Sequence, residues 1–274
     1  MRQIVNSLKK VMINADDFAQ SEAIDAAIID LANRKIISST SVLVLSPRWQ
    51  QSAKQLVNLP IQVGLHLDLT SAFSKQYGCN YGLSKLIFLA YTRQLSQQYL
   101  EKIIELQWDR FCEFYGGPPD FIDGHQHVHQ LPMVRDALFS IIAKKAWETQ
   151  QNHWLRSCYS KQWRGFKAMI VSILGAQFFT RKAFQLNINT NSDFAGVYNF
   201  NPKMNLKKSW ESWLDSLTGH HALVMCHVAM PNLKHDVDDN VNDAIYNARL
   251  NEYQWLASDD FLKLIHSKGF SQSD

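Results

Sequence analysis

The first part of the chain alternates short apolar runs with patterns of helical period. Val11–Asn14 is a compact apolar run, and the stretch Ser21–Arg34 that follows it carries apolar side chains at helical spacing, namely Ile24, Ala27, Ile28 and Leu31. Ser39–Leu45 predicts a second strand, rich in serine and branched residues. Ile61–Leu69 predicts a third, because its valine and leucines alternate with a more polar face.

The rest of the chain continues this alternation. Further strands are predicted at Phe121–Asp123 and Ala222–His227, with weaker candidates at His153–Arg156 and Phe184–Asn189. Further helices are predicted at Leu83–Gln94, Gln98–Tyr115, Pro132–Thr149, Ala244–Ser258 and Asp260–Lys268. Strands that alternate with helices imply right-handed crossovers and a largely parallel sheet. We therefore expect an α/β fold, a distorted TIM barrel of the (β/α) type with about seven strands.

Length and composition fit one globular domain. The chain has 274 residues, 46% of them apolar and 19% charged. Because barrels of this size form single domains, we expect one domain over residues 1–274 with a helical insertion at about 81–115. The net charge of +3 is too small, and the basic residues are too scattered, to predict nucleic acid or an anionic membrane surface as a partner.

Nothing in the sequence predicts export or membrane insertion. The longest apolar stretch, Ala168–Phe179, is interrupted by polar residues and is too short to span a bilayer. The first residues lack the apolar core of a secretory signal. The four cysteines stand far apart without a CxxC pair, which argues against a disulfide framework and a sulfur-ligated zinc site. We expect a cytoplasmic protein without a membrane span.

Two adjacent carboxylates, Asp16 and Asp17, end the first apolar run. Carboxylates at a buried strand end are costly unless a cation or hydrogen bonds compensate. One interpretation is that they cap the helix that begins near Ser21. The other is that one carboxylate grips a metal ion while its neighbour reaches a bound water.

Histidines stand at period two in His125, His127 and His129. If this segment is extended, their side chains project to one face, with Cα atoms roughly 7 Å apart. Imidazole is a common metal ligand, and paired histidines on a barrel strand deliver two nitrogens to one ion. The pattern predicts a metal or catalytic role for at least one of them. Asp123 is placed to orient a ligand imidazole from behind.

Two further histidines fall on predicted strands. His66 lies on the polar face of its strand, where it is either a hydrogen-bonded structural residue or a ligand, and Gly64 beside it permits a close backbone approach. His227 closes a strand that should be buried. It is either satisfied in the core or faces a cavity at the strand ends, where it would be a general acid titrating near neutrality.

Together these residues resemble the YdjC-like family of carbohydrate deacetylases, which includes the chito-oligosaccharide deacetylases. Four motifs carry the resemblance over residues 10–150, in matching order and spacing: Asn14-Ala15-Asp16-Asp17-Phe18, Ser38-Ser39-Thr40-Ser41, Gly64-Leu65-His66-Leu67-Asp68-Leu69-Thr70 and Asp123-Gly124-His125-Gln126-His127-Val128-His129. Over residues 151–274 the matches are weaker, at Arg156, Phe194-Ala195-Gly196, Cys226-His227 and Arg249-x-x-Glu252.

The resemblance implies a barrel-like deacetylase, in many relatives a homodimer, with one divalent cation usually described as magnesium. Carried over by position, the metal ligands are Asp17, His66 and His125, and Asp16 takes the place of the catalytic base. Two imidazoles and one carboxylate suit zinc better than magnesium by ligand softness. The family commonly has His-Pro-Gly where this chain reads His227-Val228-Ala229-Met230-Pro231, a departure that leaves the substrate open.

The expected reaction is hydrolysis of an N-acetyl group on an amino sugar or chito-oligosaccharide-like carbohydrate. Asp16 would accept the proton of water, and His227, with His129 as the less favoured choice, would protonate the departing amine. Two other classes stay open. One is a different metal hydrolase on a barrel, such as a phosphoesterase or amidohydrolase, which usually holds a second metal. The other is a non-catalytic sugar- or metal-binding relative, which needs no base at Asp16.

Overall fold

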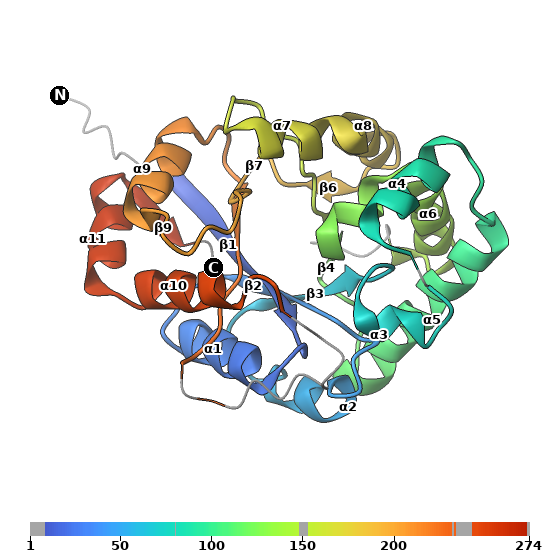
Figure 1. The fold of residues 1–274 in the computed structure, drawn as a ribbon, viewed down its shortest axis with the longest axis horizontal. Coiled ribbons are helices and arrows are strands. Elements are labelled where there is room, and N and C mark those ends of the chain that lie inside the picture. Colours follow the sequence, from blue (N-terminus) through green and yellow to red (C-terminus); the bar gives the residue numbers. More distant parts are fainter. Residues whose placement is uncertain (1–8, 80, 148–152, 232, 234–242, 273–274) are drawn as a thin grey trace.

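A curled parallel sheet forms the centre of the protein (Figure 1). The computed structural model describes residues 9–79, 81–147, 153–231, 233 and 243–272. Within these residues the strands are β1 (Lys9–Phe18), β2 (Ser39–Val42), β3 (Gln62–Leu67), β4 (Phe121–Gly124), β5 (Trp154–Leu155), β6 (Asn189–Thr190), β7 (Asp193–Ala195), β8 (Ala222–Cys226) and β9 (Phe270–Gln272). Their order is β6-β5-β4-β3-β2-β1-β8-β7, and β9 joins β1.

Helices surround the sheet on its outer side (Figure 1). They are α1 (Glu22–Asn33), α2 (Trp49–Ser52), α3 (Ala72–Lys75), α4 (Leu83–Tyr91), α5 (Gln97–Tyr115), α6 (Val134–Lys144), α7 (Phe166–Val171), α8 (Gln177–Gln185), α9 (Leu206–Ser216), α10 (Tyr246–Leu256) and α11 (Asp259–Ser267). The pairings between strands in the described residues are all parallel. The predicted α/β class with a parallel, barrel-like sheet is therefore confirmed, with nine strands in the described chain.

The sheet curls into a half-barrel, and its open seam lies between β6 and β7, which follow each other in the chain but are the two ends of the hydrogen-bonded order. Asn191 lies at this seam. Its side chain accepts from the backbone N–H of Ser157 at 2.7 Å and donates to the backbone oxygens of Ser157 and Asp193, both at 2.9 Å. One side chain thus ties the β5 side of the sheet to β7.

β1 is an interior strand, with β2 on one side and β8 on the other. Val11, Ile13 and Ala15 are completely buried, as expected of a parallel strand covered on both faces. The strand extends beyond the predicted Val11–Asn14 and includes both aspartates that follow. β3 and β4 also approach closely at Gly64, where a Cβ atom would overlap the ring of Phe121.

Most predicted helices have counterparts in the structure. Ser21 caps α1 by accepting a hydrogen bond from the backbone N–H of Ile24. The helices α4, α5, α6, α10 and α11 fall within their predicted ranges to within one residue. Residues 148 and 149 of the predicted helix Pro132–Thr149 lie outside the described chain. The strand predicted at Phe184–Asn189 is wrong. Its first residues end α8, because Phe179 and Ala183 are buried at helical spacing.

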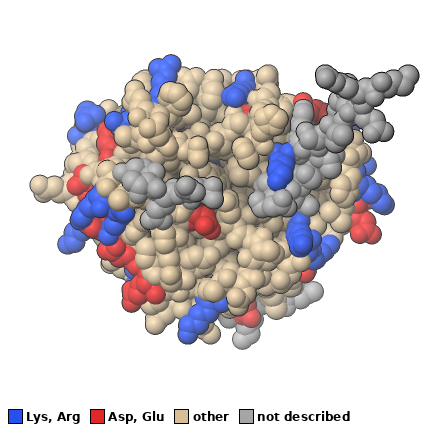
Figure 2. All heavy atoms as spheres, turned by 180° about the vertical axis from the view of Figure 1, so that it is seen from behind, with Lys and Arg blue, Asp and Glu red and all other residues tan. Residues whose placement is uncertain are grey.

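Charge is spread over the surface. On the face seen in Figure 2, lysines and arginines are interspersed with acidic side chains around the edge. In the part of the chain that the structure describes, no helix is both long and apolar enough to cross a membrane. The cytoplasmic location stays a prediction.

Candidate metal centre and active site

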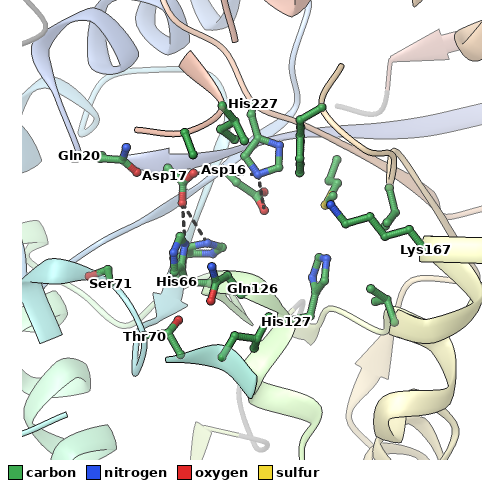
Figure 3. Close-up of a pocket in the computed structure, with 18 of the residues that line it drawn as sticks. Asp16, Asp17, Gln20, His66, Thr70, Ser71, Gln126, His127, Lys167 and His227 are labelled. Atoms are coloured by element: carbon green, nitrogen blue, oxygen red, sulfur yellow. Dashed lines mark hydrogen bonds and ion pairs between the residues drawn. The ribbon is translucent and has the colours of Figure 1, made fainter. Parts of the chain in front are cut away.

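Most of the residues predicted to carry chemistry line one cavity of about 700 Å³. Asp16 and Asp17 come from β1, His66 from β3, and His125 and His227 directly follow β4 and β8. Figure 3 shows the labelled side chains of Asp16, Asp17, His66 and His227 facing one another. The carboxyl ends of parallel strands meet at one rim of a barrel, which is why residues far apart in the sequence converge here.

A bulge in β1 lets two neighbouring aspartates reach the same cavity. β1 pairs Ala15 with Thr40 and Phe18 with Val42, so two residues of β1 stand opposite one residue of β2. Asp17 occupies the left-handed region with φ 75°, a conformation that asparagine and aspartate tolerate better than most residues. On a regular strand adjacent side chains would point to opposite faces; the bulge removes this alternation.

Asp17, His66 and His125 bring three ligand-type atoms to one point. Oδ1 of Asp17 lies 3.3 Å from Nε2 of His66 and 3.1 Å from Nδ1 of His125. The three donor atoms lie within 4.8 Å of one another. One oxygen and two nitrogens at this spacing fit a single divalent cation. The structure thus brings together the three residues that the motifs predicted as metal ligands.

Asp123 fixes the ring of His66 from behind. Nδ1 of His66 donates to Oδ1 of Asp123 at 2.6 Å, which leaves Nε2 to face Asp17. The other oxygen of Asp123 lies 2.6 Å from a guanidinium nitrogen of Arg156. Ligand histidines commonly have such a carboxylate partner, which sets the tautomer and the ring orientation. Asp123 has the geometry that this orienting role requires.

Asp16, His66 and Asp123 form a second group of potential metal donors. This group shares His66 with the first, and both of its carboxylates are paired with Arg156. The guanidinium already supplies the positive charge that these carboxylates need, and a second ion would have to displace it. The described residues therefore favour one ion over the paired ions of many barrel hydrolases.

The surroundings of His66 favour positive charge. Burial lowers the pKa of His66, but Asp123, Asp17 and Asp16 outweigh this effect and raise the pKa to about 10. The carboxylates around His66 therefore stabilise a positive charge at this position. A metal ion would replace that proton, since a ligand histidine must be deprotonated at the coordinating nitrogen.

Three hydrogen bonds from two side chains hold Asp16. Arg156 donates from Nη1 to Oδ2 at 2.8 Å and from Nη2 to Oδ1 at 2.6 Å, and the side chain of Asn14 donates to Oδ1 at 2.7 Å. Burial raises the pKa of Asp16, but Arg156, with help from His66 and His227, holds it well below its usual range. Asp16 is therefore an ionised, firmly oriented carboxylate of weak intrinsic basicity.

His227 stands above both aspartates (Figure 3). Its Nε2 lies 4.0 Å from Oδ2 of Asp16 and 3.9 Å from Oδ2 of Asp17. Burial lowers the pKa of His227 to about 4, although both carboxylates act to raise it. Desolvation thus opposes titration of this ring near neutrality, and the ring also packs against Phe200 with 5.1 Å between ring centres.

The histidine-rich segment is not the extended strand that its period predicts. β4 ends at Gly124, and His125–Gln130 form a 3₁₀ turn in which Gln126 and His127 have φ of 52° and 61°. The chain folds back so tightly that a Cβ on Gly124 would lie 3.0 Å from the backbone nitrogen of His129. The three rings therefore separate. His125 faces Asp17, and His127 lines the cavity (Figure 3).

His129 lies outside the cavity lining. It is fully buried, and its Nε2 donates to the backbone oxygen of Arg156 at 2.9 Å. Burial lowers its pKa to about 4. His129 supports the segment that carries Arg156, and because it is buried outside the cavity lining, the geometry favours His227 over it as the general acid.

Two residues of α10 complete the site and had only the weaker motif match as a signal. Arg249 donates from Nη2 to Oδ2 of Asp17 at 2.7 Å. Glu252 accepts from the hydroxyl of Tyr198 at 2.7 Å and from the backbone N–H of His227 at 3.2 Å. Burial raises the pKa of Glu252 to about 8. Their spacing of three residues puts both on one helix face.

A curled parallel half-barrel with a candidate one-metal centre at its strand ends places this chain among the α/β barrel proteins. The chain belongs to the YdjC-like protein family, whose model matches residues 10–267.

Two chitooligosaccharide deacetylases are similar in sequence. The protein of Proteus mirabilis (strain HI4320) is 32% identical over 142 residues, which cover 50% of this chain and 54% of that protein. The protein of Yersinia pestis (strain Pestoides F) is 29% identical over 145 residues, 50% of this chain and 57% of that protein. The chain thus spans about half the length of the relatives it matches.

Solved structures share the fold. A protein from Enterococcus faecalis V583, named for a proposed role in cellobiose-phosphate cleavage, has a TM-score of 0.72 over 98% of both chains at 20% identity. A peptidoglycan N-acetylglucosamine deacetylase has a TM-score of 0.51 at 11% identity, over 96% of this chain and 85% of that one. At such identities the likeness establishes the architecture.

Proposed function

We propose that this protein is a metal-dependent deacetylase that hydrolyses the N-acetyl group of an amino sugar, of the chito-oligosaccharide class. The convergence of Asp17, His66 and His125 beside Asp16 and His227 carries the proposal, because it places a metal centre, a carboxylate and an imidazole in one cavity. The two sequence relatives are named chitooligosaccharide deacetylases, which supports the choice of reaction and sugar.

The residues present fit one divalent ion. Asp17 offers Oδ1 while its Oδ2 is held by Arg249, and His66 is oriented by Asp123. A bound ion would polarise the acetamide carbonyl and lower the pKa of a water molecule at the site. Nitrogen-rich ligation favours zinc or a similar transition ion, whereas the family resemblance favours magnesium.

Asp16 and His227 provide the proton chemistry of the chain itself. Asp16 accepts a proton as water attacks the acetyl carbonyl carbon, and Arg156 keeps its carboxylate pointed at the cavity. His227 gives a proton to the sugar nitrogen as the C–N bond breaks, which yields acetate and a free amine.

The protonation state of His227 sets the order of these events. Burial lowers its pKa to about 4, which favours a neutral ring, so in this mechanism the ring first receives the proton that it later donates. Oδ2 of Asp16 is 4.0 Å from Nε2 of His227, a gap that a water molecule bonded to both atoms can bridge. The proton of the attacking water therefore has a short path through Asp16 to His227 and on to the amine.

Acetate release tests the proposal directly. Metal-stripped protein, reloaded with defined ions, should release acetate from N-acetylglucosamine oligomers, and Asp16→Asn should abolish most of this turnover while metal binding persists. Acetate release that is unaffected by Asp16→Asn would reject the role of the base. Absence of release from every N-acetylated sugar, with the metal bound, would favour a non-catalytic binding protein.

The rival metal hydrolases differ in metal content. Phosphoesterases and amidohydrolases on barrels usually use a pair of ions, whereas the pairing of Asp16 and Asp123 with Arg156 leaves donors for one. Hydrolysis of a phosphoester with two bound ions would replace the deacetylase proposal.

A further inference from the structure

α7 and the turn after it separate the cavity from an apolar outer surface. Lys167, Ile170 and Val171 line the active-site cavity. On the same short segment, Phe166 and Ile173 are 67% and 68% exposed. Phe166, Ile170 and Ile173 stand at the i, i+4, i+7 spacing of one helix face. The segment thus borders the substrate site and also exposes large apolar side chains, and Ile170 belongs to both sets.

These side chains belong to a larger surface, which we call the apolar rim: Trp163, Phe166, Ile170, Ile173 and Phe178, each 39% to 70% exposed. Trp163, Ile173 and Phe178 line one hollow of about 480 Å³ on the outer surface. A single exposed apolar residue needs no explanation, but a contiguous group of large ones marks an interaction surface.

The segment that carries the apolar rim is basic. Residues 149–192 contain no Asp or Glu. Within it, Arg156 and Arg164 are buried in ion pairs with aspartates. The remaining cations are exposed and border the rim: Lys161 lines the same hollow, Lys167 follows Phe166, and Arg181 and Lys182 stand one helical turn after Phe178. The modest net charge of the whole chain conceals this local concentration.

We propose that the apolar rim docks on an anionic lipid bilayer. Aromatic and aliphatic side chains would enter the interfacial region while Lys161, Arg181 and Lys182 contact the headgroups. The competing occupant is a second copy of the chain. A two-fold interface there would set the same cations against each other without an acidic partner from this segment, whereas an anionic bilayer neutralises them.

Docking in this way would bring the mouth of the catalytic cavity to the bilayer, because Ile170 belongs to both surfaces. The docking proposal rests on the proposed function and adds a substrate class to it. The substrate would be an N-acetylated amino sugar attached to a lipid, with the sugar inside the cavity and the lipid in the membrane.

Vesicle sedimentation tests the docking without any assay of catalysis. The full chain should sediment with vesicles of phosphatidylcholine mixed with phosphatidylglycerol and much less with phosphatidylcholine alone. The double variant Phe166→Ser with Ile173→Ser should bind roughly tenfold or more weakly. Neutralising Arg181 and Lys182 with glutamine should weaken binding by about 25-fold, roughly fivefold for each charge.

Matched controls separate the rim from general surface effects. Val57→Ser removes an apolar side chain that is 55% exposed and follows α2 in the chain, and α2 lies on the side of the molecule opposite α7 in Figure 1. Lys263→Gln removes an exposed cation on α11. Both should bind vesicles as the unaltered protein does. Because the rim positions tested are highly exposed, the serine variants should keep their melting temperatures.

Two outcomes would overturn the proposal: no sedimentation with anionic vesicles, or a lipid-independent dimer in analytical ultracentrifugation that Phe166→Ser with Ile173→Ser dissolves. Acetate release from a soluble N-acetylated oligomer distinguishes the two proposals. Loss of vesicle binding with normal release would place the defect in docking, whereas vesicle binding without any release would reject the proposed reaction and leave the docking surface standing.

Discussion

Arg156 and Asp16, 140 positions apart in the sequence, form a two-pronged ion pair buried at the base of the cavity. The same guanidinium also holds Asp123, which in turn orients His66. One arginine therefore connects the proposed base to the proposed metal centre. A substitution of Arg156 should therefore affect both the position of Asp16 and the geometry of the metal centre.

Arg156→Lys tests this connection. Lysine keeps the charge but cannot hold a carboxylate through two parallel hydrogen bonds. We expect kcat for deacetylation to fall by about a hundredfold, because a small misplacement of a catalytic group is costly. Steady-state kinetics with circular dichroism as a fold control would measure it. Arg164→Lys, at a buried arginine paired with Asp193 away from the cavity, is the matched control and should spare kcat in the folded protein. An unchanged kcat in Arg156→Lys would contradict the connection.

Asp17→Asn should remove most of the metal binding. The amide is a poorer ligand than the carboxylate, and asparagine tolerates the left-handed backbone of position 17. Isothermal titration with zinc should give one site per chain in the unaltered protein and a strongly weakened site in the variant. Metal should raise the melting temperature of the first protein and not of the second. A stoichiometry of two ions would refute the one-metal centre.

The identity of the ion follows from the donor set. Two imidazole nitrogens and one carboxylate oxygen bind zinc and cobalt more strongly than magnesium. We expect stripped protein to regain activity with zinc or cobalt at concentrations where magnesium has no effect. Acetate release after add-back of each ion measures this. Full recovery with magnesium alone would instead support the metal that the family resemblance implies.

His227→Asn and His129→Asn should differ in kind. The first removes the proposed proton donor, so kcat should fall by about a hundredfold or more while zinc affinity stays within the same range. The second removes a buried contact to the backbone of Arg156, so its main effect should be a lower melting temperature. A larger loss of kcat in His129→Asn than in His227→Asn, with both proteins folded, would reverse the assignment.

The buried ion pair of Asp193 and Arg164 should make the free energy of unfolding depend on pH in the acidic range. Both contacts are 2.8 Å, and although burial raises the pKa of Asp193, Arg164 and nearby backbone N–H groups lower it below 3.8. A carboxylate whose pKa is lower in the folded than in the unfolded protein stabilises the fold fully at pH values above the unfolded-state pKa. This stabilisation is lost as the pH falls through the folded-state pKa. Asp193→Asn should reduce the free energy of unfolding by about 3 kcal/mol at neutral pH.

Urea unfolding at neutral pH and at about pH 3 checks this dependence, since the difference between the two proteins should shrink in acid. A difference of equal size at both pH values would show that the carboxylate charge is not the cause.

The sheet and many of its helices follow from local patterns. The apolar period of Ser21–Arg34 defines α1, and the alternation in Ile61–Leu69 defines β3. α9 is absent from the sequence-based expectation although Leu206, Trp210 and Trp213 stand at helical spacing, so its signal was available. Strands of two or three residues such as β6 and β7 carry too little pattern to be detected.

The site divides in the same way. The order of the motifs predicts Asp17, His66 and His125, and the structure brings them together. The turn at His125–Gln130 could not be predicted from its period, because its left-handed residues and the approach to Gly124 depend on tertiary packing. Arg156 follows β5 and Arg249 lies on α10, so their contacts with Asp16 and Asp17 depend on how distant elements pack together, which no local pattern encodes.

The left-handed backbone at Asp17 also limits how this centre can evolve or be redesigned. Few side chains tolerate a φ of 75° without strain. A different ligand residue at this position would therefore add backbone strain, which any gain in ion binding would have to outweigh. Glutamate keeps the charge but loses the short reach and the tolerance for this conformation. His66, on a regular strand paired with β4, has no such restriction. Attempts to retune the metal preference should therefore begin at the histidine and leave the aspartate in place.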